Sequence, residues 1–145
     1  MRLNKLIWYD DYTSGIEVID NQHKIIFNAF NDFYHAFNSD EMNKIVIDKL
    51  IETIDSYTTI HFDTEEEYMI MHNFFGYEDH KKRHDFFKNI YKEIKENKFF
   101  RHSRNHLFAL NLATVTSEWW GIHITTYDRE LTNFIKTNKS KGIRE

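Results

Sequence analysis

Apolar residues recur at helical spacing in four segments of the chain. In the first segment they are separated by three, four or seven residues: Ile19, Ile26, Phe30, Phe33 and Phe37. Side chains at these intervals lie on one face of an α-helix, so the pattern predicts an amphipathic helix over about residues 20–37. Asp20 is the expected N-cap of this helix.

Three further segments repeat the pattern and predict helices over about 41–72, 77–97 and 105–124. We expect Asn38-Ser39-Asp40 to end the first helix and cap the second. Asn73-Phe74-Phe75-Gly76 is the expected break after the second helix. The faces expected to point inward carry polar as well as apolar residues. In the helix over 41–72 they are Ile47, Leu50, Ile51, Ile54, Thr58, His61, Glu65, Tyr68 and His72. In the helix over 77–97 they are His80, His84, Phe87, Tyr91 and Ile94, and in the helix over 105–124 they are Leu112, Val115, Trp119 or Trp120, and His123.

Four amphipathic helices with short connections predict an all-α fold, an antiparallel up-down-up-down four-helix bundle. Pro 0 and Gly 4 agree with long, uninterrupted helices. A chain of 145 residues is expected to form a single domain over residues 1–145. Its parts are an irregular N-terminal arm over 1–19, the bundle over about 20–124 and a short C-terminal helix over about 128–136.

The composition narrows the classes of protein. Hydrophobic residues at 41% and charged residues at 29% are typical of a globular chain. Cys 0 excludes disulfides, thiolate metal sites and cysteine nucleophiles. A formal net charge of −4 gives no general attraction to nucleic acid or anionic lipid, and neither a signal peptide nor a membrane-spanning run is evident. We therefore expect a cytoplasmic protein, a monomer or weak homo-oligomer, with no nucleic-acid or membrane partner.

Polar residues on the inward faces predict a metal site. His61 and Glu65 are one helical turn apart, and so are His80 and His84, so each pair projects from one helix face. His23 and His123 lie on the inner faces of the two other helices. Buried imidazoles and carboxylates without partners would be very costly, and metal ions remove that cost. Such a nitrogen and oxygen set suits two iron or manganese ions better than one zinc ion.

Asp128 can join the candidate metal ligands only if the helix is interrupted after His123. It follows His123 by five residues, which on a continuous α-helix would place the two side chains about 140° apart. We therefore expect a break in the β-branched stretch Ile124-Thr125-Thr126. Asp128 would then cap a last helix from Arg129 to Lys136 and turn its carboxylate inward.

Several polar residues have simpler explanations. In the run Glu65-Glu66-Glu67, we expect Glu65 to face inward and its two neighbours to face water. His102 and His106 form another pair four residues apart but are expected at the surface. His72 shares the face of His61 but lies about 16 Å along the helix. His23 alone could equally be a core histidine bonded to a backbone carbonyl.

Taken together, the motifs resemble the hemerythrin family, specifically its single-domain bacterial members. The resemblance rests on four segments: Trp8 with Tyr12–Lys24, His61–Met69 as HFxxEExxM, His80–Phe87 as HxxxHxxF, and Trp119–Ile124 as WxxxHI followed by Asp128. It implies two non-haem iron ions, oxo- or hydroxo-bridged. It assigns the ligands as His80, His84 and His123 on one iron, His23 and His61 on the other, and Glu65 and Asp128 as bridges.

The same resemblance implies reversible dioxygen binding, for storage, delivery or sensing, at the open position of the two-histidine iron. Candidate residues to line the oxygen pocket are Ile26, Phe62, Trp120 and Ile124, although the family more often has leucine where Trp120 stands. The alternatives are a di-iron oxidase or peroxidase, an iron or redox sensor, and a mononuclear zinc protein. The chain has no Glu-x-x-His motif of ferritin-like enzymes, which favours oxygen binding over catalysis.

Overall fold

All regular secondary structure in the described part of the chain is helical. A computed structural model describes residues 12–96 and 106–140. Its helices are α1 (Glu17–Asn38), α2 (Lys44–Met71), α3 (Tyr77–Glu96), α5 (His106–His123), the π-helical turn η2 (Ile124–Asp128) and α6 (Arg129–Ser140). The prediction of an all-α four-helix bundle is confirmed.

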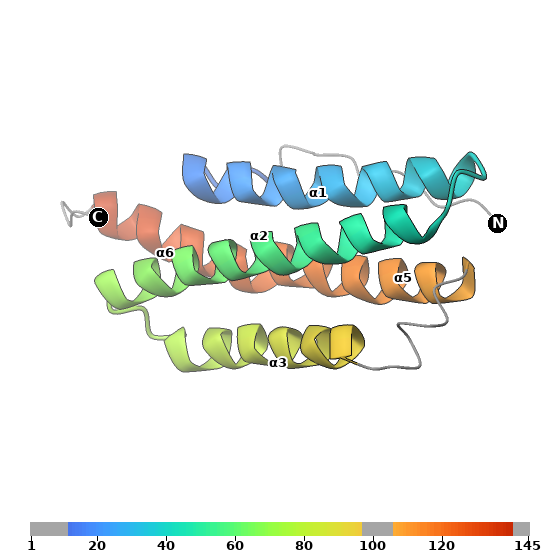
Figure 1. The fold of residues 1–145 in the computed structure, drawn as a ribbon. Helices are drawn as coiled ribbons and strands as arrows, with labels where there is room; N and C mark the ends of the chain where they lie inside the picture. Colours follow the sequence, from blue (N-terminus) through green and yellow to red (C-terminus); the bar gives the residue numbers. More distant parts are fainter. Residues whose placement is uncertain (1–11, 97–105, 141–145) are drawn as a thin grey trace.

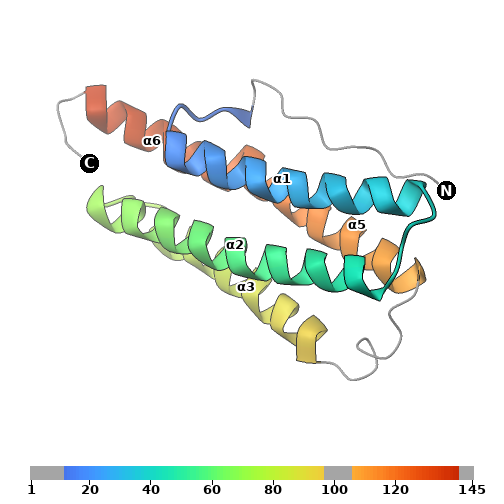
Figure 2. The same cartoon turned by 45° about the horizontal axis from the view of Figure 1, so that its top comes forward.

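The four long helices lie side by side along one common direction (Figure 1). α1 packs against α2, and α2 packs against α3. α5 completes the bundle, and the chain continues through η2 into α6 as one nearly continuous helical rod (Figure 2). No helix within the described ranges is both long and apolar enough to cross a membrane.

Two apolar clusters fill the interior at different positions along the bundle axis. The larger one joins all four long helices and includes Phe30, Phe33, Ile54, Phe62 and Trp120. The smaller one packs α6 and the start of α1 against the α2–α3 connection through Ile16, Ile19, Met69, Phe74, Leu131 and Ile135. Burying each of these large side chains stabilises the fold by about 1.5–3 kcal/mol. The polar residues described below lie along each helix between these two clusters.

The start of α1 differs from the prediction. Asp20 is not the N-cap: α1 begins three residues earlier, and Ile16 at its N-cap offers no side-chain hydrogen bond. The Asp20 carboxylate instead accepts hydrogen bonds from the backbone N–H groups of Ser14 (2.8 Å) and Gly15 (3.1 Å) and from the Ser14 hydroxyl (2.8 Å). Gly15 permits this turn because its φ is +84°. Asp20 therefore ties the arm to α1 rather than starting the helix.

The start of α2 also lies later than predicted. Asn43, and not the segment Asn38-Ser39-Asp40, caps this helix, because its side-chain oxygen accepts a hydrogen bond from Val46 N–H at 3.0 Å. The expected break at Asn73-Phe74-Phe75-Gly76 is confirmed, since α2 ends at Met71 and α3 begins at Tyr77.

One residue on the inward face of α5 differs from the prediction. Val115 is 55% exposed, whereas its neighbour Thr116 is buried and donates a hydrogen bond to the Leu112 carbonyl at 2.6 Å. Of the two adjacent tryptophans, Trp120 is the buried one and Trp119 is only partly covered.

Candidate metal centre

Five elements bring their polar residues into one buried layer of the bundle. α1 contributes His23, α2 His61 and Glu65, α3 His80 and His84, α5 His123, and η2 Asp128. None of these residues is more than 2% exposed. A layer of this kind would destabilise the bundle severely unless its groups were paired or bound to metal.

The layer divides into two sets that could each hold an ion. His23 and His61 form one set, and their Nε2 atoms lie 3.0 Å apart. His80, His84 and His123 form the other, in which the Nε2 atom of His123 lies 3.2 Å from that of His80 and 3.1 Å from that of His84.

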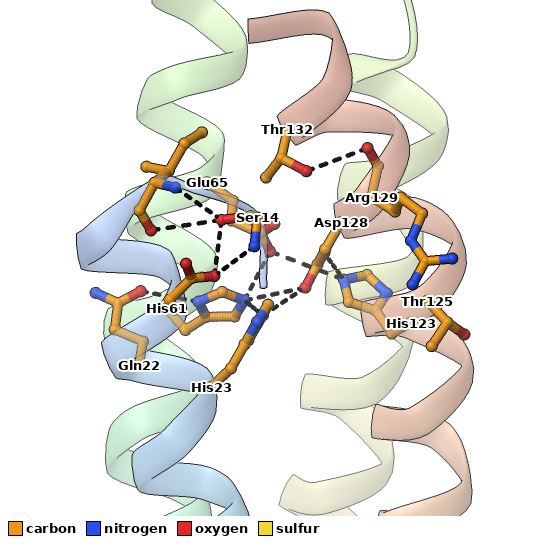
Figure 3. A network of polar contacts seen from close by, with 12 residues as sticks. Ser14, Gln22, His23, His61, Glu65, His123, Thr125, Asp128, Arg129 and Thr132 are labelled. Carbon is orange, nitrogen blue, oxygen red and sulfur yellow. Dashed lines mark hydrogen bonds and ion pairs between the residues drawn. The ribbon is translucent and has the colours of Figure 1, made fainter. Parts of the chain in front are cut away.

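Asp128 belongs to both sets (Figure 3). Its Oδ2 atom lies 2.8 Å from His23 Nε2 and 3.2 Å from His61 Nε2. Its Oδ1 atom lies 2.8 Å from His123 Nε2 and 3.1 Å from His80 Nε2. Each carboxylate oxygen therefore faces a different set of histidines.

Glu65 lies between the same two sets from the α2 side. Its Oε1 atom is 3.0 Å from His61 Nε2 and 3.3 Å from His84 Nε2. The carboxylate is fully buried and faces these imidazoles as an ion pair, but neither of its oxygens has a hydrogen bond of good geometry from a described residue. A buried carboxylate left in this state is the kind of group that a metal ion satisfies.

The distances between neighbouring ligand atoms fit a metal centre. Two ligands at right angles, each about 2.1 Å from an ion, lie about 3.0 Å apart. All of the separations given above fall between 2.8 and 3.3 Å. Nitrogen and carboxylate oxygen donors without a thiolate are a set that iron, manganese and zinc all accept.

The way in which Asp128 reaches the layer differs from the prediction. No break separates it from His123, and it does not cap α6, because Asp128 is itself the last residue of the helical turn η2 and α6 follows directly at Arg129. Instead η2 widens the helix by a π-helical turn, which brings residues five apart closer to one face. The hydroxyls of Thr125 and Thr126 donate to the carbonyls of Gly121 (2.8 Å) and Ile122 (2.5 Å) and support this turn. α6 then continues to Ser140, beyond the predicted end at residue 136.

Two further residues orient the imidazoles, and sequence reasoning missed both. His61 Nδ1 donates to Gln22 Oε1 at 2.8 Å, and Gln22 Nε2 donates to Thr64 Oγ1 at 3.0 Å. His84 Nδ1 donates to Glu66 Oε2 at 2.9 Å. These bonds leave each Nε2 directed at the centre, the role that outer partners have around metal-bound histidines.

The prediction that Glu66 faces water is therefore wrong, because its carboxylate turns back toward His84 and its side chain is only 14% exposed. Its neighbour Glu67 is exposed, as expected. Nothing in the local sequence distinguishes the two glutamates. The partner of Glu66 comes from another helix, so only the packing of α2 on α3 reveals it.

The carboxylates and imidazoles of the layer shift one another's pKa values. Burial by itself lowers the pKa of His61, but the carboxylates of Glu65 and Asp128 raise it overall, to about 10. Burial likewise opposes ionisation of Asp128, yet His123 and its neighbours hold the pKa of that carboxyl well below its usual range. Burial and the nearby His61 lower the pKa of His23. Without metal, the buried carboxylates thus favour the protonated form of His61, His80 and His123, whereas burial favours the neutral form of His23.

The four residues expected to line an oxygen pocket are all buried, but they do not share one position. Phe62 stacks on His84 with ring centroids 3.8 Å apart, so it covers the three-histidine set. Trp120 lies 5.5 Å from the His61 ring and 5.5 Å from Phe62. Ile26 belongs to the larger apolar cluster, whereas Ile124 also lines a cavity that reaches His23 and Asp128.

The two other histidines whose side chains the structure describes, His35 and His72, take no part in the two sets. His72 is buried at the end of α2, where its Nδ1 atom lies 3.2 Å from Asn138 Nδ2 and accepts from it. His35 is exposed. His102 lies outside the described residues, and the side chain of His106 is not described either.

The helical bundle and its buried histidine and carboxylate layer define a metal-binding four-helix protein. Comparison with known proteins gives the family. The model of the "Hemerythrin HHE cation binding domain" matches residues 14–135. The chain therefore belongs to the hemerythrin family.

Curated relatives agree over most of the chain. It is 30% identical over 140 residues to a bacteriohemerythrin of Stenotrophomonas maltophilia, covering 97% of this chain and 88% of that protein. It is 29% identical over 130 residues to a bacteriohemerythrin of Clostridium acetobutylicum, covering 86% and 96%. A hemerythrin of Themiste dyscrita is 29% identical over 80 residues, which cover 55% of this chain and 63% of that protein. No solved structure gave a significant match.

Proposed function

We propose that this protein binds dioxygen reversibly at a pair of non-haem iron ions. In this proposal His80, His84 and His123 hold one ion, and His23 and His61 hold the other. Glu65 and Asp128 bridge them. When bound, the iron pair supplies the two electrons that oxygen accepts on binding and returns on release.

The single observation that carries the proposal is the position of Asp128. Its two oxygens each lie within 3.2 Å of two imidazole nitrogens, and the two pairs of imidazoles belong to different sets. One carboxylate shared in this way is suited to hold two ions at a fixed spacing. A site built for a lone ion has no use for the second oxygen or for the second set of histidines.

The unequal division of histidines supports a binding role. Asp128 belongs to both sets, and Glu65 lies 3.0 Å from His61 Nε2, so three imidazoles and two imidazoles would share the same two carboxylates. An ion at His23 and His61 would then have one protein ligand fewer. An incompletely coordinated ion can accept an external ligand, whereas closed sites are typical of structural metals. Trp120 places an apolar ring 5.5 Å from the His61 ring on this side of the centre, whereas Phe62 stacks on His84 on the other side.

The same ligand set favours oxygen binding over a di-iron oxidase or peroxidase. Ferritin-like di-iron proteins take four glutamates and two histidines from their helices, whereas this layer offers five histidines and two carboxylates. Fewer anionic ligands stabilise highly oxidised iron less well. Steady consumption of peroxide or ferrous iron, well above the rate of spontaneous oxidation, would support the enzymatic alternative.

An optical titration tests the proposal. The reduced, iron-loaded protein is exposed stepwise to oxygen and then deoxygenated. We expect a near-ultraviolet and visible charge-transfer band that saturates at one oxygen molecule per two irons and disappears on deoxygenation. The His61→Ala variant should lose the band, and His35→Ala, which changes an exposed histidine, should keep it. A band that bleaches irreversibly, or one that survives in His61→Ala, argues against reversible binding at this site.

We further propose that the chain forms one domain. The family match spans residues 14–135, and both apolar clusters join helices from its two ends. A single cooperative unfolding transition is the expected observation. The oligomeric state, a monomer or weak homo-oligomer, stays a prediction that light scattering tests.

A further inference from the structure

One side of the bundle is formed by the outer surfaces of α3 and α5, which lie next to each other (Figure 1). The rings of Phe87 and Trp119 are 4.4 Å apart, and the rings of His84 and His123 are 4.9 Å apart. The partner on α5 moves forward along the chain as the residue on α3 moves back, so the two helices are antiparallel. Residue 87 of α3 is therefore level with residue 119 of α5.

Each of the two helices presents a row of exposed residues on this side of the bundle. Side chains separated by three, four, seven or eleven residues lie on one face of a helix. The rows are Lys82, Phe86, Asn89 and Glu93 on α3, and Val115, Glu118 and Ile122 on α5, all of them exposed. We call these seven residues the α3–α5 face.

The α3–α5 face exposes large apolar side chains in its middle. Phe86 is 54% exposed, Val115 55% and Ile122 56%. A single exposed apolar residue is ordinary at a protein surface, but several that are grouped on neighbouring helices are typical of an interaction site. The face is therefore a candidate for contact with another protein surface.

The charges of the α3 row select the partner. Lys82 stands at one end of the row and Glu93 at the other, with Phe86 and Asn89 between them. The row is therefore complementary to a second copy of itself that runs in the opposite direction. In that arrangement each Lys82 faces Glu93 of the other copy, and each Phe86 packs beside Asn89 of the other copy.

Lys82 and Glu93 are available for such pairing. They are eleven residues apart, which is about 16 Å along a helix, so they cannot reach each other within one chain. Within the described ranges, neither side chain forms an ion pair with another residue. Contact between two copies would give each of them a partner of opposite charge.

The α5 row fits the same two-fold axis. An axis midway between Lys82 and Glu93 passes α3 beside Phe87, which is level with Trp119 of α5. Trp119 in turn lies close to the midpoint between Val115 and Ile122. The axis that pairs the charges of α3 therefore also places Val115 of one copy against Ile122 of the other. This agreement of two helices on one axis favours a second copy of the chain over an unrelated partner.

We propose that the α3–α5 face is the interface of a two-fold symmetric homodimer, in which α3 and α5 each pack antiparallel against their counterparts. The same surface is used by both copies, as closed two-fold symmetry requires. The proposal goes beyond the proposed function and does not depend on iron, because no residue of the face is a candidate metal ligand.

The size of the face predicts a weak dimer. Two helix surfaces of twelve residues, each about 18 Å long and about 10 Å wide, give roughly 700 Å² of flat contact over both copies. Stable interfaces bury about 1,200–2,000 Å² of accessible surface, and smaller ones are typical of transient contacts. We therefore expect a dissociation constant of roughly 0.1 mM.

Glu118 opposes dimer formation in this geometry. It lies next to the two-fold axis, so the Glu118 carboxylates of the two copies approach each other and repel. Glu118→Gln should strengthen the dimer about twofold to fivefold at low ionic strength. A dimer that Glu118→Gln weakens would overturn the proposed position of the axis.

Sedimentation of the full-length protein from micromolar to millimolar concentration tests the interface. Ile122→Ser should raise the dissociation constant of the dimer by about fivefold or more, because the apolar contact with Val115 is lost. Ile60→Ser is the matched control, since Ile60 is 50% exposed on α2, outside the face, and it should leave the dimer unchanged. A chain that stays monomeric at millimolar concentration overturns the proposal and leaves the face to a different protein. A dimer that both variants weaken equally overturns it as well.

Exchange of charges tests the antiparallel packing. Lys82→Glu and Glu93→Lys should each weaken the dimer about threefold to tenfold, because each puts like charges opposite one another. The double variant Lys82→Glu/Glu93→Lys should restore the parent dissociation constant. Since the two positions are too far apart to interact within one chain, restoration requires contact between two copies. A double variant that dimerises no better than the single variants overturns the antiparallel arrangement.

Discussion

Replacing Glu66 tests how the bundle holds its three-histidine set. The His84 Nδ1–H group donates to the Glu66 carboxylate at 2.9 Å, and the glutamate side chain is only 14% exposed. This bond holds the ring so that its other nitrogen faces the centre. We expect Glu66→Gln and Glu66→Ala both to weaken iron binding, the second more than the first.

The expected magnitudes follow from the kind of bond that is lost. A hydrogen bond to a charged group contributes about 1.5–3 kcal/mol, and one between neutral groups contributes about 0.5–1.5 kcal/mol. Glutamine keeps an acceptor for His84 but loses the charge, so Glu66→Gln should cost about 1 kcal/mol, or about fivefold in affinity. Alanine leaves the Nδ1–H group without an acceptor, and the loss should reach about tenfold to a hundredfold.

Competition with a chelator measures the effect. Iron retained per chain is followed against chelator concentration in the parent protein and in both variants. Glu67→Gln is the matched control, because Glu67 is the next residue on the same helix and is exposed. Circular dichroism of the metal-free variants checks that all of them fold. If Glu66→Gln and Glu66→Ala retain iron as well as Glu67→Gln does, the outer hydrogen bond does not hold the ligand, and this reasoning is wrong.

Three further predictions follow from the centre and its surroundings. Trp120→Leu should change the autoxidation rate of the oxygenated protein, since the indole lies 5.5 Å from His61; an unchanged rate would mean that Trp120 does not line the oxygen site. Asp20→Asn should lower the free energy of unfolding by about 1–2 kcal/mol in a denaturant titration, because hydrogen bonds from the arm lose their charged acceptor; equal stability would show that the arm is held in another way. In the metal-free protein, facing carboxylates outweigh burial and raise the pKa of His61 to about 10 and of His80 to about 9, so both rings carry an extra proton at pH 7. Metal ligation requires neutral imidazoles, so iron loading in weak buffer should release at least two protons per chain, and loading without proton release would exclude these rings as ligands.

Periodicity alone predicts much of the bundle. Each segment with apolar residues at helical spacing is a helix. One apolar face favours the helical conformation and also determines which side of the helix packs into the core. The exact ends depend on interactions that periodicity does not contain. Asp20 looks like an N-cap but bonds the arm, and Asn43 caps α2 in place of the earlier polar cluster.

The candidate centre could be predicted from the sequence only in part, because several of its contacts depend on how the helices pack. Six of its seven residues are recognisable because their spacing places them on inward faces, whereas Asp128 reaches the layer only through η2. The π-helical turn could not be predicted from the sequence. The hydroxyls of Thr125 and Thr126 donate hydrogen bonds to carbonyls of the preceding turn, and these bonds keep the chain helical where a break was expected. Gln22 and Glu66 are likewise hidden, since the ring that each one holds comes from a different helix. Partners far apart in sequence are visible only after the helices have packed.

Anomalous diffraction at the iron absorption edge tests the central claim most directly. Crystals of iron-loaded protein should give two peaks of similar height, roughly 3–4 Å apart. One peak should lie among His80, His84 and His123 and the other beside His23 and His61, with Asp128 between them. A single peak, no peak, or imidazoles turned away from the bundle interior would contradict a shared two-iron centre.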